Sequence, residues 1–332
     1  MNDSENNGEQ DPAWDHFSIG LELLGEGNHA GSIEELSKAI EIDPSFSGAY
    51  RVRGAIHGRM GDEVSALRDL NLAVQLDPDF VLNRIARGLA YLRTNSLELA
   101  LADLNKAVDL DPNYRRAHFQ RGKATVLAYG ERALECVLPD FDRAIQLDTK
   151  NSHAYFYRGL VRYSLQDFAG ALSDLQTMVS MTSFAPATEY AAIWCYLSSS
   201  AVGQSRTEGQ DRLAQFLRQR QWTRYWPIPV MRYYLGEISD TELFAAAYTS
   251  DQIPPLLQRL QSMGWRVRRY HTDFKAQALQ AEYYIGANCL ILGNRSDAMS
   301  HFRLASDLSC NFPESWALMR LLQSDALGKR NP

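Results

Sequence analysis

Cysteine is scarce in this chain of 332 residues, which contains four: Cys136, Cys195, Cys289 and Cys310. The cysteines are widely spaced and form no CxxC pair, so neither a zinc site nor a dithiol redox motif is predicted. The sequence also lacks the HExxH, GxSxG and Walker motifs that mark common catalytic sites. We therefore predict a protein that is not an enzyme and uses no metal and no cofactor.

Long apolar runs are absent as well. The longest, near Ala191–Leu197, is far shorter than the roughly 18 residues that a membrane-spanning helix needs, so no membrane contact is predicted. The formal net charge is −6, which gives no reason to expect nucleic acid as a partner. A composition of 45% apolar and 22% charged residues is that of a soluble globular protein with a real core.

The first twelve residues contain four acidic residues, no basic residue and a single apolar one, Met1. Such a segment cannot bury enough surface to offset its ordering entropy, so residues 1–12 are expected to form a disordered acidic tail. The segment lacks the basic and apolar regions of a signal peptide, and no lipobox cysteine follows. Together with the unpaired cysteines, this predicts a cytoplasmic protein.

A period of 34 residues runs through the first half of the chain. Gly20, Gly54, Gly88 and Gly122 follow one another at this spacing, and Gly159 comes 37 residues later. Two other residue types share the period: Pro44, Pro78 and Pro112, which each end an Ile/Leu-Asp-Pro triplet, and Ala39, Ala73 and Ala107. Over residues 13–183 this pattern resembles the tetratricopeptide repeat family.

The pattern has a direct physical interpretation as pairs of amphipathic helices. Small residues allow the two helices of a repeat to pack closely, and one repeat cannot bury its apolar face alone. We predict an all-α, right-handed solenoid of about fourteen helices. Its expected parts are five repeats in 13–185, divergent helical repeats in 186–278, and a repeat with a capping helix in 279–328. In the fourth repeat Thr149 replaces the proline, and an insertion near Glu131–Pro139 lengthens the period.

Charged residues follow the same register in the second to fifth repeats. An arginine precedes the glycine and an aspartate lies in the second helix: Arg53, Arg87, Arg121 and Arg158, with Asp69, Asp103, Asp140 and Asp174. We predict a bidentate, partly buried ion pair between the two helices of each repeat. The alternative is a row of charges along a ligand groove. His16, His57 and His118 are expected to face the paired helix as packing residues.

The second half of the chain is less regular. A helix pair is predicted in 187–220 with a turn near Gly203, and further helices in 227–235, 239–248 and 254–264. A sixth repeat motif follows at Gly286, Gly293, Ala298, Phe302 and Ala305, with an apolar capping helix in 314–327. The stretches 226–243 and 283–302 resemble the C-terminal half of the NlpI lipoprotein family. This resemblance implies a repeat adaptor that binds other proteins and forms a homodimer.

The first helices of the repeats are expected to line a concave groove that binds a protein or peptide. At spacings of three and four residues, the predicted groove residues are Trp14, Phe17, Arg51, Leu82, Ile85, Leu89, Leu92, Arg116, Phe119, Lys123, Phe156 and Tyr163. An exposed apolar stripe is typical of a binding surface, and the basic residues favour acidic groups. In the alternative interpretation, neighbouring repeats or a dimer partner cover the stripe.

A second surface is predicted in residues 204–275, which contain eleven basic and seven acidic residues. Arginine and aromatic residues alternate there, and we assign the surface to Arg220, Trp222, Arg224, Trp226, Trp265, Arg268 and Arg269. Such residues are typical anchors of protein interfaces. The alternatives are a solvated basic face with buried tryptophans, an RNA-binding surface, or an enzyme site within 186–278. The favoured function is a non-catalytic scaffold for protein partners.

Overall fold

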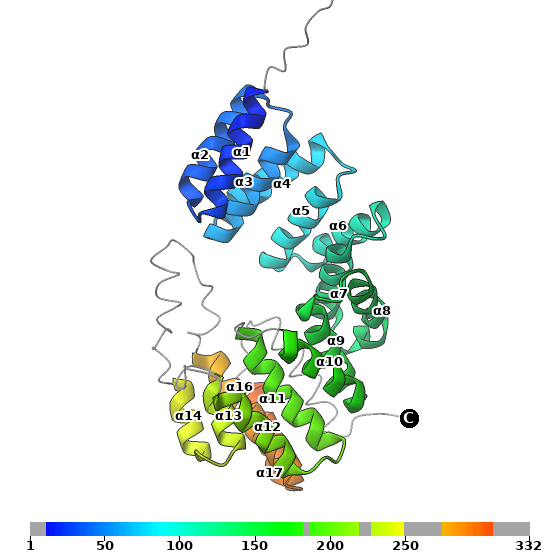
Figure 1. Cartoon of the computed structure of the whole chain (residues 1–332), viewed down its shortest axis with the longest axis vertical. Helices are drawn as coiled ribbons and strands as arrows, with labels where there is room; N and C mark the ends of the chain where they lie inside the picture. The colour runs from blue at the N-terminus through cyan, green and yellow to red at the C-terminus, as the bar shows by residue number, and fades with distance from the viewer. Residues whose placement is uncertain (1–10, 182–185, 219–226, 249–273, 308–332) are drawn as a thin grey trace, which may run out of the picture. The chain divides into compact units, whose positions relative to one another are not determined.

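The computed structural model describes residues 11–181, 186–218, 227–248 and 274–307. Across these residues the regular structure is entirely helical, with sixteen α-helices and one 3-10 turn (Figure 1). The helices form two compact units, α1–α6 in residues up to 113 and α7–α17 from residue 114 onwards. Residues 1–10 of the acidic tail predicted for 1–12, and the helices predicted in 254–264 and 314–327, lie outside the described residues. The last two residues of the predicted tail are ordered, because Asp11 caps α1 and Pro12 is its first residue.

The first unit consists of three helix pairs. Its helices are α1 (Pro12–Gly25), α2 (His29–Ile42), α3 (Ser47–Met60), α4 (Glu63–Leu76), α5 (Val81–Arg93) and α6 (Leu97–Leu110). Asp11, Asn28 and Asp62 cap α1, α2 and α4, because each side chain accepts a hydrogen bond from a backbone N–H of the first turn. The three prolines of the repeat lie in the turns that end the second helices. The predicted register of the repeats is confirmed here.

The second unit starts with two further pairs and continues into the divergent region. Its helices are α7 (Arg115–Tyr129), α8 (Leu134–Leu147), α9 (Ser152–Ser164), α10 (Phe168–Met181), α11 (Pro186–Ala201), α12 (Arg206–Arg218), α13 (Ile228–Tyr234), α14 (Asp240–Tyr248), α16 (Phe274–Ile291) and α17 (Arg295–Asp307). The insertion in the fourth repeat forms the 3-10 turn Gly130–Ala133. The helix pair with its turn at Gly203 and the two short helices that follow are confirmed.

The repeat glycines lie where the two helices of a pair approach most closely. A methyl group on Gly54 would lie 2.9 Å from Leu70 Cγ and 3.0 Å from the carbonyl oxygen of Ala66. These distances are shorter than ordinary van der Waals contacts, so a larger residue would push α3 away from α4. Gly286 of the sixth repeat is packed in the same way, since a methyl group on it would lie 2.9 Å from Phe302 Cε1. The role predicted for these glycines is therefore confirmed.

The four predicted arginine–aspartate pairs are all present and bidentate. Arg53 Nε donates to Asp69 Oδ2 at 2.8 Å, and its Nη2 donates to Asp69 Oδ1 at 2.9 Å. The equivalent pairs are Arg87–Asp103, Arg121–Asp140 and Arg158–Asp174. The aspartate side chains are buried. These charges therefore hold the helix pairs together, and the alternative of a charged ligand groove is not supported at these positions.

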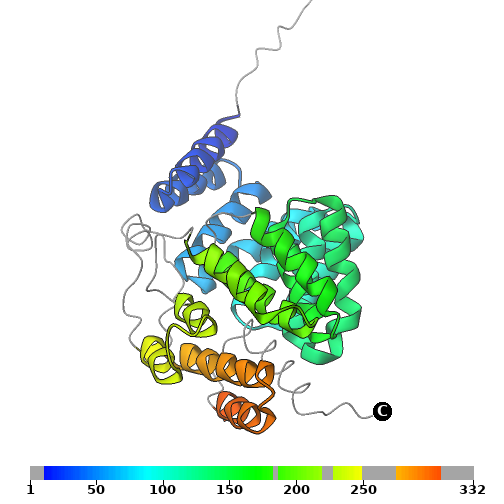
Figure 2. The same cartoon turned by 60° about the horizontal axis from the view of Figure 1, so that its bottom comes forward.

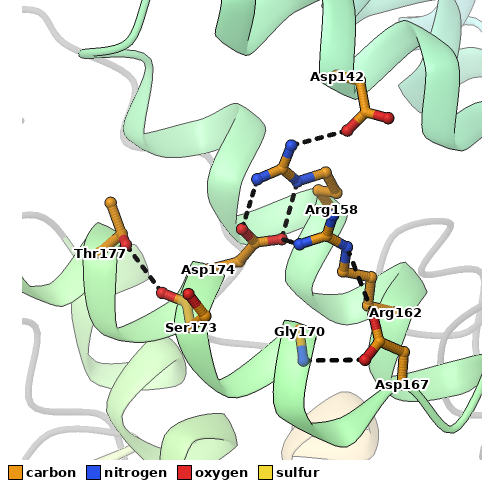
Figure 3. A network of polar contacts seen from close by, with 8 residues as sticks. All are labelled: Asp142, Arg158, Arg162, Asp167, Gly170, Ser173, Asp174 and Thr177. Carbon is orange, nitrogen blue, oxygen red and sulfur yellow. Dashed lines mark hydrogen bonds and ion pairs between the residues drawn. The ribbon is translucent and has the colours of Figure 1, made fainter.

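Three of these four arginines also reach back to the preceding repeat. Arg53 Nη1 donates to Ser37 Oγ at 3.0 Å, and Arg87 Nη1 donates to Asn71 Oδ1 at 3.2 Å. Figure 3 shows the corresponding network at Arg158, which donates to Asp142 at 2.7 Å as well as to Asp174. Arg53, Arg87 and Arg158 thus each contact a residue 16 positions before and one 16 positions after.

In the first and sixth repeats, a histidine–glutamate pair joins the two helices in place of the arginine–aspartate pair. In the first repeat, where Ile19 stands in place of the arginine, His16 Nδ1 lies 2.6 Å from Glu35 Oε2. Hydrogen bonds from Lys38 and from His16 lower the pKa of Glu35. In the sixth repeat the polarity is reversed, since Glu282 lies on the first helix and His301 on the second, 2.7 Å apart. The packing role predicted for His16 is confirmed.

The core of the second unit is rich in tyrosine. Tyr196, Tyr234 and Tyr284 are almost completely buried, and the Tyr234 hydroxyl donates to the Tyr284 carbonyl at 3.0 Å. Burial raises the pKa of Tyr234 and of Tyr284. This hydrogen bond joins α13 to α16, and α16 packs along α17 (Figure 2). Helices distant in the sequence therefore share one core.

Candidate functional site

The predicted groove residues differ in how far they reach solvent. Trp14 and Arg116 are exposed, and Trp14 has 56% of its surface accessible. Eight others are half-buried: Arg51, Leu82, Leu89, Leu92, Phe119, Lys123, Phe156 and Tyr163. These residues belong to first helices in both units.

Two of the groove predictions are wrong, because Phe17 and Ile85 are buried with 6% and 2% of their surface exposed. Each of these residues lies three positions before a repeat glycine and shares a helical face with it. A methyl group on Gly88 would meet Leu104 at 3.1 Å, so this face is the seam between the two helices. The apolar spacing cannot separate the seam from the groove when both are lined by hydrophobic side chains.

Aromatic rings gather at the start of the first unit. The ring of Trp14 stacks on Phe46 with 5.7 Å between centroids and 16° between planes, and it lies 5.3 Å from Phe17. We call Trp14, Phe17 and Phe46 the aromatic platform. Phe46 belongs to the turn before α3. Gly48 leaves room for its ring, since a methyl group on Gly48 would lie 3.1 Å from Phe46 Cε2. The buried ring of Phe17 therefore supports the exposed ring of Trp14.

The turn before α5 contains a second exposed ring of the first unit. Phe80 has 39% of its surface exposed, and the guanidinium carbon of Arg51 lies 5.7 Å from its ring centroid. A guanidinium at this distance from a ring is held in place by a cation–π contact. Arginine and aromatic residues are the side chains that most often anchor protein interfaces.

The second unit contains a cleft of about 400 Å³ between the start of α7 and the turn from α8 to α9. Its walls are formed by Tyr114, Arg115, Arg116, Phe119, Gln120, Asp148, Lys150, Asn151, Ser152 and His153. We call this the basic cleft. Arg116 and Phe119 were predicted from the helical register. The helical periodicity gives no signal for Lys150, because this residue lies in a turn.

Charges in the basic cleft are unevenly paired. Arg115 Nε lies 3.1 Å from Asp148 Oδ2, and the backbone N–H of Lys150 donates to Asp148 Oδ1 at 3.0 Å. Among the residues that the structure describes, no ion pair joins the side chains of Arg116 or Lys150 to an acidic residue. The cleft therefore carries an excess of positive charge.

Other predicted residues are placed in local aromatic contacts. Lys123 Nζ lies 5.6 Å from the ring centroid of Tyr157, and Tyr163 packs edge-on against Trp194 at 5.1 Å. The predicted second surface (Arg220, Trp222, Arg224, Trp226, Trp265, Arg268 and Arg269) lies outside the described residues.

Metal-binding clusters and membrane-spanning helices are both absent from the described residues. No group of three or more histidine, cysteine or acidic side chains could hold a metal ion there. None of the described helices is both long and apolar enough to cross a membrane. The thiol of Cys195 is desolvated by burial, which raises its pKa to about 12, so it is a poor nucleophile at neutral pH.

Two segments in the first half of the chain match models of a known repeat family. A tetratricopeptide repeat model matches residues 16–46, and a TPR repeat model matches residues 88–126. No curated protein sequence matches significantly. PilF from Pseudomonas aeruginosa is similar in structure, with 16% identity, a TM-score of 0.56, and coverage of 62% of this chain and 91% of its own.

A tetratricopeptide repeat protein from Parabacteroides merdae is similar over more of the chain. It has 13% identity and a TM-score of 0.52, and the match covers 93% of this chain and 98% of the other. At such identities the likeness shows the fold. Residues 16–46 and 88–126 thus match tetratricopeptide repeat models, and the fold as a whole is similar to that of a tetratricopeptide repeat solenoid.

Proposed function

We propose that the protein is a non-catalytic scaffold that binds a protein or peptide partner through the first helices of its repeats. The observation that carries this proposal is the aromatic platform, where Trp14 is more than half exposed on top of two other rings. Exposing the apolar ring of a tryptophan to water costs free energy that a bound partner would recover. Tryptophan is also a frequent hot spot of interfaces. The rigid support beneath it reduces the entropy lost on binding.

Exposed apolar residues elsewhere provide a contrast. Val64 on α4 has 74% of its surface exposed, but it is an isolated residue on a second helix. Single apolar side chains on a surface need no functional explanation. Trp14 differs because its ring contacts both Phe17 and Phe46. The proposal therefore rests on the cluster and not on exposure alone.

Selection from a library of random twelve-residue peptides, displayed on phage, tests the proposal on the full chain. We expect enriched peptides to bind the protein in solution, as measured by fluorescence anisotropy. Trp14→Ser should weaken this binding by about tenfold or more, the loss typical of an interface hot spot. Val64→Ser is the matched control and should leave the affinity unchanged. Absence of any enriched peptide, or equal loss in both variants, would contradict the proposal.

The finer expectations from the sequence stay predictions. These are the likeness to the NlpI family, the homodimer, the cytoplasmic location and the domain boundaries. Sedimentation of the full chain at micromolar concentration tests the homodimer. The RNA-binding alternative depends on residues outside the described part of the chain, and an enzyme site within 186–278 would lie partly outside it.

A further inference from the structure

We propose that the basic cleft in the second unit binds an acidic segment of a peptide, with a carboxylate or phosphate group held by Arg116 and Lys150. This inference rests on the proposed function, since it names the chemistry of the partner at one part of the scaffold. It uses residues of α7, of the turn from α8 to α9, and of the start of α9.

Positive charge is locally in excess at the basic cleft. The protein as a whole has a formal net charge of −6, yet the cleft is lined by three basic side chains and one carboxylate. That carboxylate, Asp148, is already engaged by Arg115 and by the backbone of its own turn. Arg116 and Lys150 are therefore left to attract an anion.

The orientation of two helices adds to the positive potential. Both α7 and α9 begin at the cleft, with Arg115 and Ser152 as their first residues. The side chain of Tyr114, which precedes α7, forms no capping hydrogen bond. Backbone N–H groups at a helix start carry a partial positive charge and favour anions. This effect reinforces the basic side chains and would not define a site without them.

The size and the walls of the cleft favour a peptide. A volume of about 400 Å³ accommodates a few side chains. Phe119 contributes an apolar wall, and its ring is held edge-on by His153 at 6.4 Å and by Tyr157 at 5.5 Å. An acidic residue next to an aliphatic one would match this combination. A nucleic acid fits less well, because a polyanion would also meet the negative charge of the rest of the chain.

Binding of three labelled peptides to the full-length protein tests this proposal by fluorescence anisotropy at low salt. The acidic peptide has the sequence Gly-Ser-Glu-Glu-Leu-Glu-Glu-Ser-Gly. A neutral peptide has glutamine in place of glutamate, and a third peptide has phosphoserine in those positions. We expect the acidic or the phosphorylated peptide to bind at least tenfold more tightly than the neutral one. The tighter of the two identifies the preferred anion.

Charge reversal then locates the site. The double variant Arg116→Glu/Lys150→Glu should bind the charged peptide no better than the neutral one. Arg68→Glu/Lys106→Glu is the matched control, because it reverses one arginine and one lysine at exposed positions on α4 and α6. Circular dichroism confirms that both variants fold. Equal affinity of the wild type for all three peptides, or equal losses in both double variants, would overturn the inference.

The test separates this inference from the proposed function. Trp14→Ser should leave binding of the acidic peptide unchanged, because Trp14 lies in the other unit. If library peptides bind through Trp14 but the acidic peptide does not bind, the scaffold function stands and the basic cleft is refuted.

Discussion

The arginine that precedes the repeat glycine joins three helices in three of the repeats. Arg53 lies on α3 and contacts Asp69 on α4 and Ser37 on α2. Its Nη1 is the atom that reaches back, while Nε and Nη2 form the pair within the repeat. Lysine lacks the planar fork that donates to a carboxylate through two N–H groups while a third reaches another helix, which explains why arginine occupies this position.

Removing Arg53 should destabilise the first unit strongly. In Arg53→Ala the carboxylate of Asp69 stays buried without its partner, and we expect a loss of about 3 kcal/mol in the free energy of unfolding. Arg59→Ala is the control, because Arg59 is exposed at the end of α3, and it should change stability by less than about 0.5 kcal/mol. Urea unfolding followed by circular dichroism measures both. Equal stability of the two variants would show that the pair contributes little.

The cysteines should differ sharply in reactivity with pH. Cys195 has a pKa raised to about 12 by burial, so it stays protonated as the pH rises from 7 to 9, whereas Cys136 is exposed. We expect iodoacetamide to label Cys136 and not Cys195 over this range, as measured by mass spectrometry of digested peptides. Labelling of Cys195 at pH 8 at the rate of Cys136 would mean that the core around α11 is open.

At the scale of elements, close packing of paired helices depends on the repeat glycine. Gly54→Ala should destabilise the protein by about 1–3 kcal/mol, because the new methyl group would crowd Leu70 and the Ala66 carbonyl. Gly25 is the matched control, since it ends α1 with no neighbouring atom within 4 Å of a methyl group. Gly25→Ala should be neutral or slightly stabilising. Thermal unfolding that ranks the two variants in the opposite order would contradict the assigned register.

The sequence predicts the helices better than it predicts which side chains form the surfaces. Spacing alone predicts the helix pairs, because the glycine, alanine and proline positions are fixed by packing between neighbouring helices. It does not predict that Ile85 is buried, since the seam and the groove have the same apolar character. Nor does it predict the Glu282–His301 pair, where the two charges have exchanged helices. The spacing does not predict Lys150 either, because turns carry no helical period.

At the scale of the whole molecule, two compact units should unfold in separable steps. Gly54→Ala acts in the first unit, and Gly159→Ala, whose methyl group would lie 2.9 Å from Leu175 Cγ, acts in the second. Scanning calorimetry should show two transitions, each lowered by one of the two variants. A single transition that both variants lower equally would mean that the repeats unfold together despite the division.

The central claim is that the first helices present the surface that binds a partner peptide. Hydrogen exchange with mass spectrometry, on the full chain with and without a library-selected peptide, tests it most directly. We predict slower exchange in α1 and at the start of α3 when the peptide is bound, with α2 and α4 unchanged. Protection confined to the second helices, or no protection in the first unit, would contradict the account.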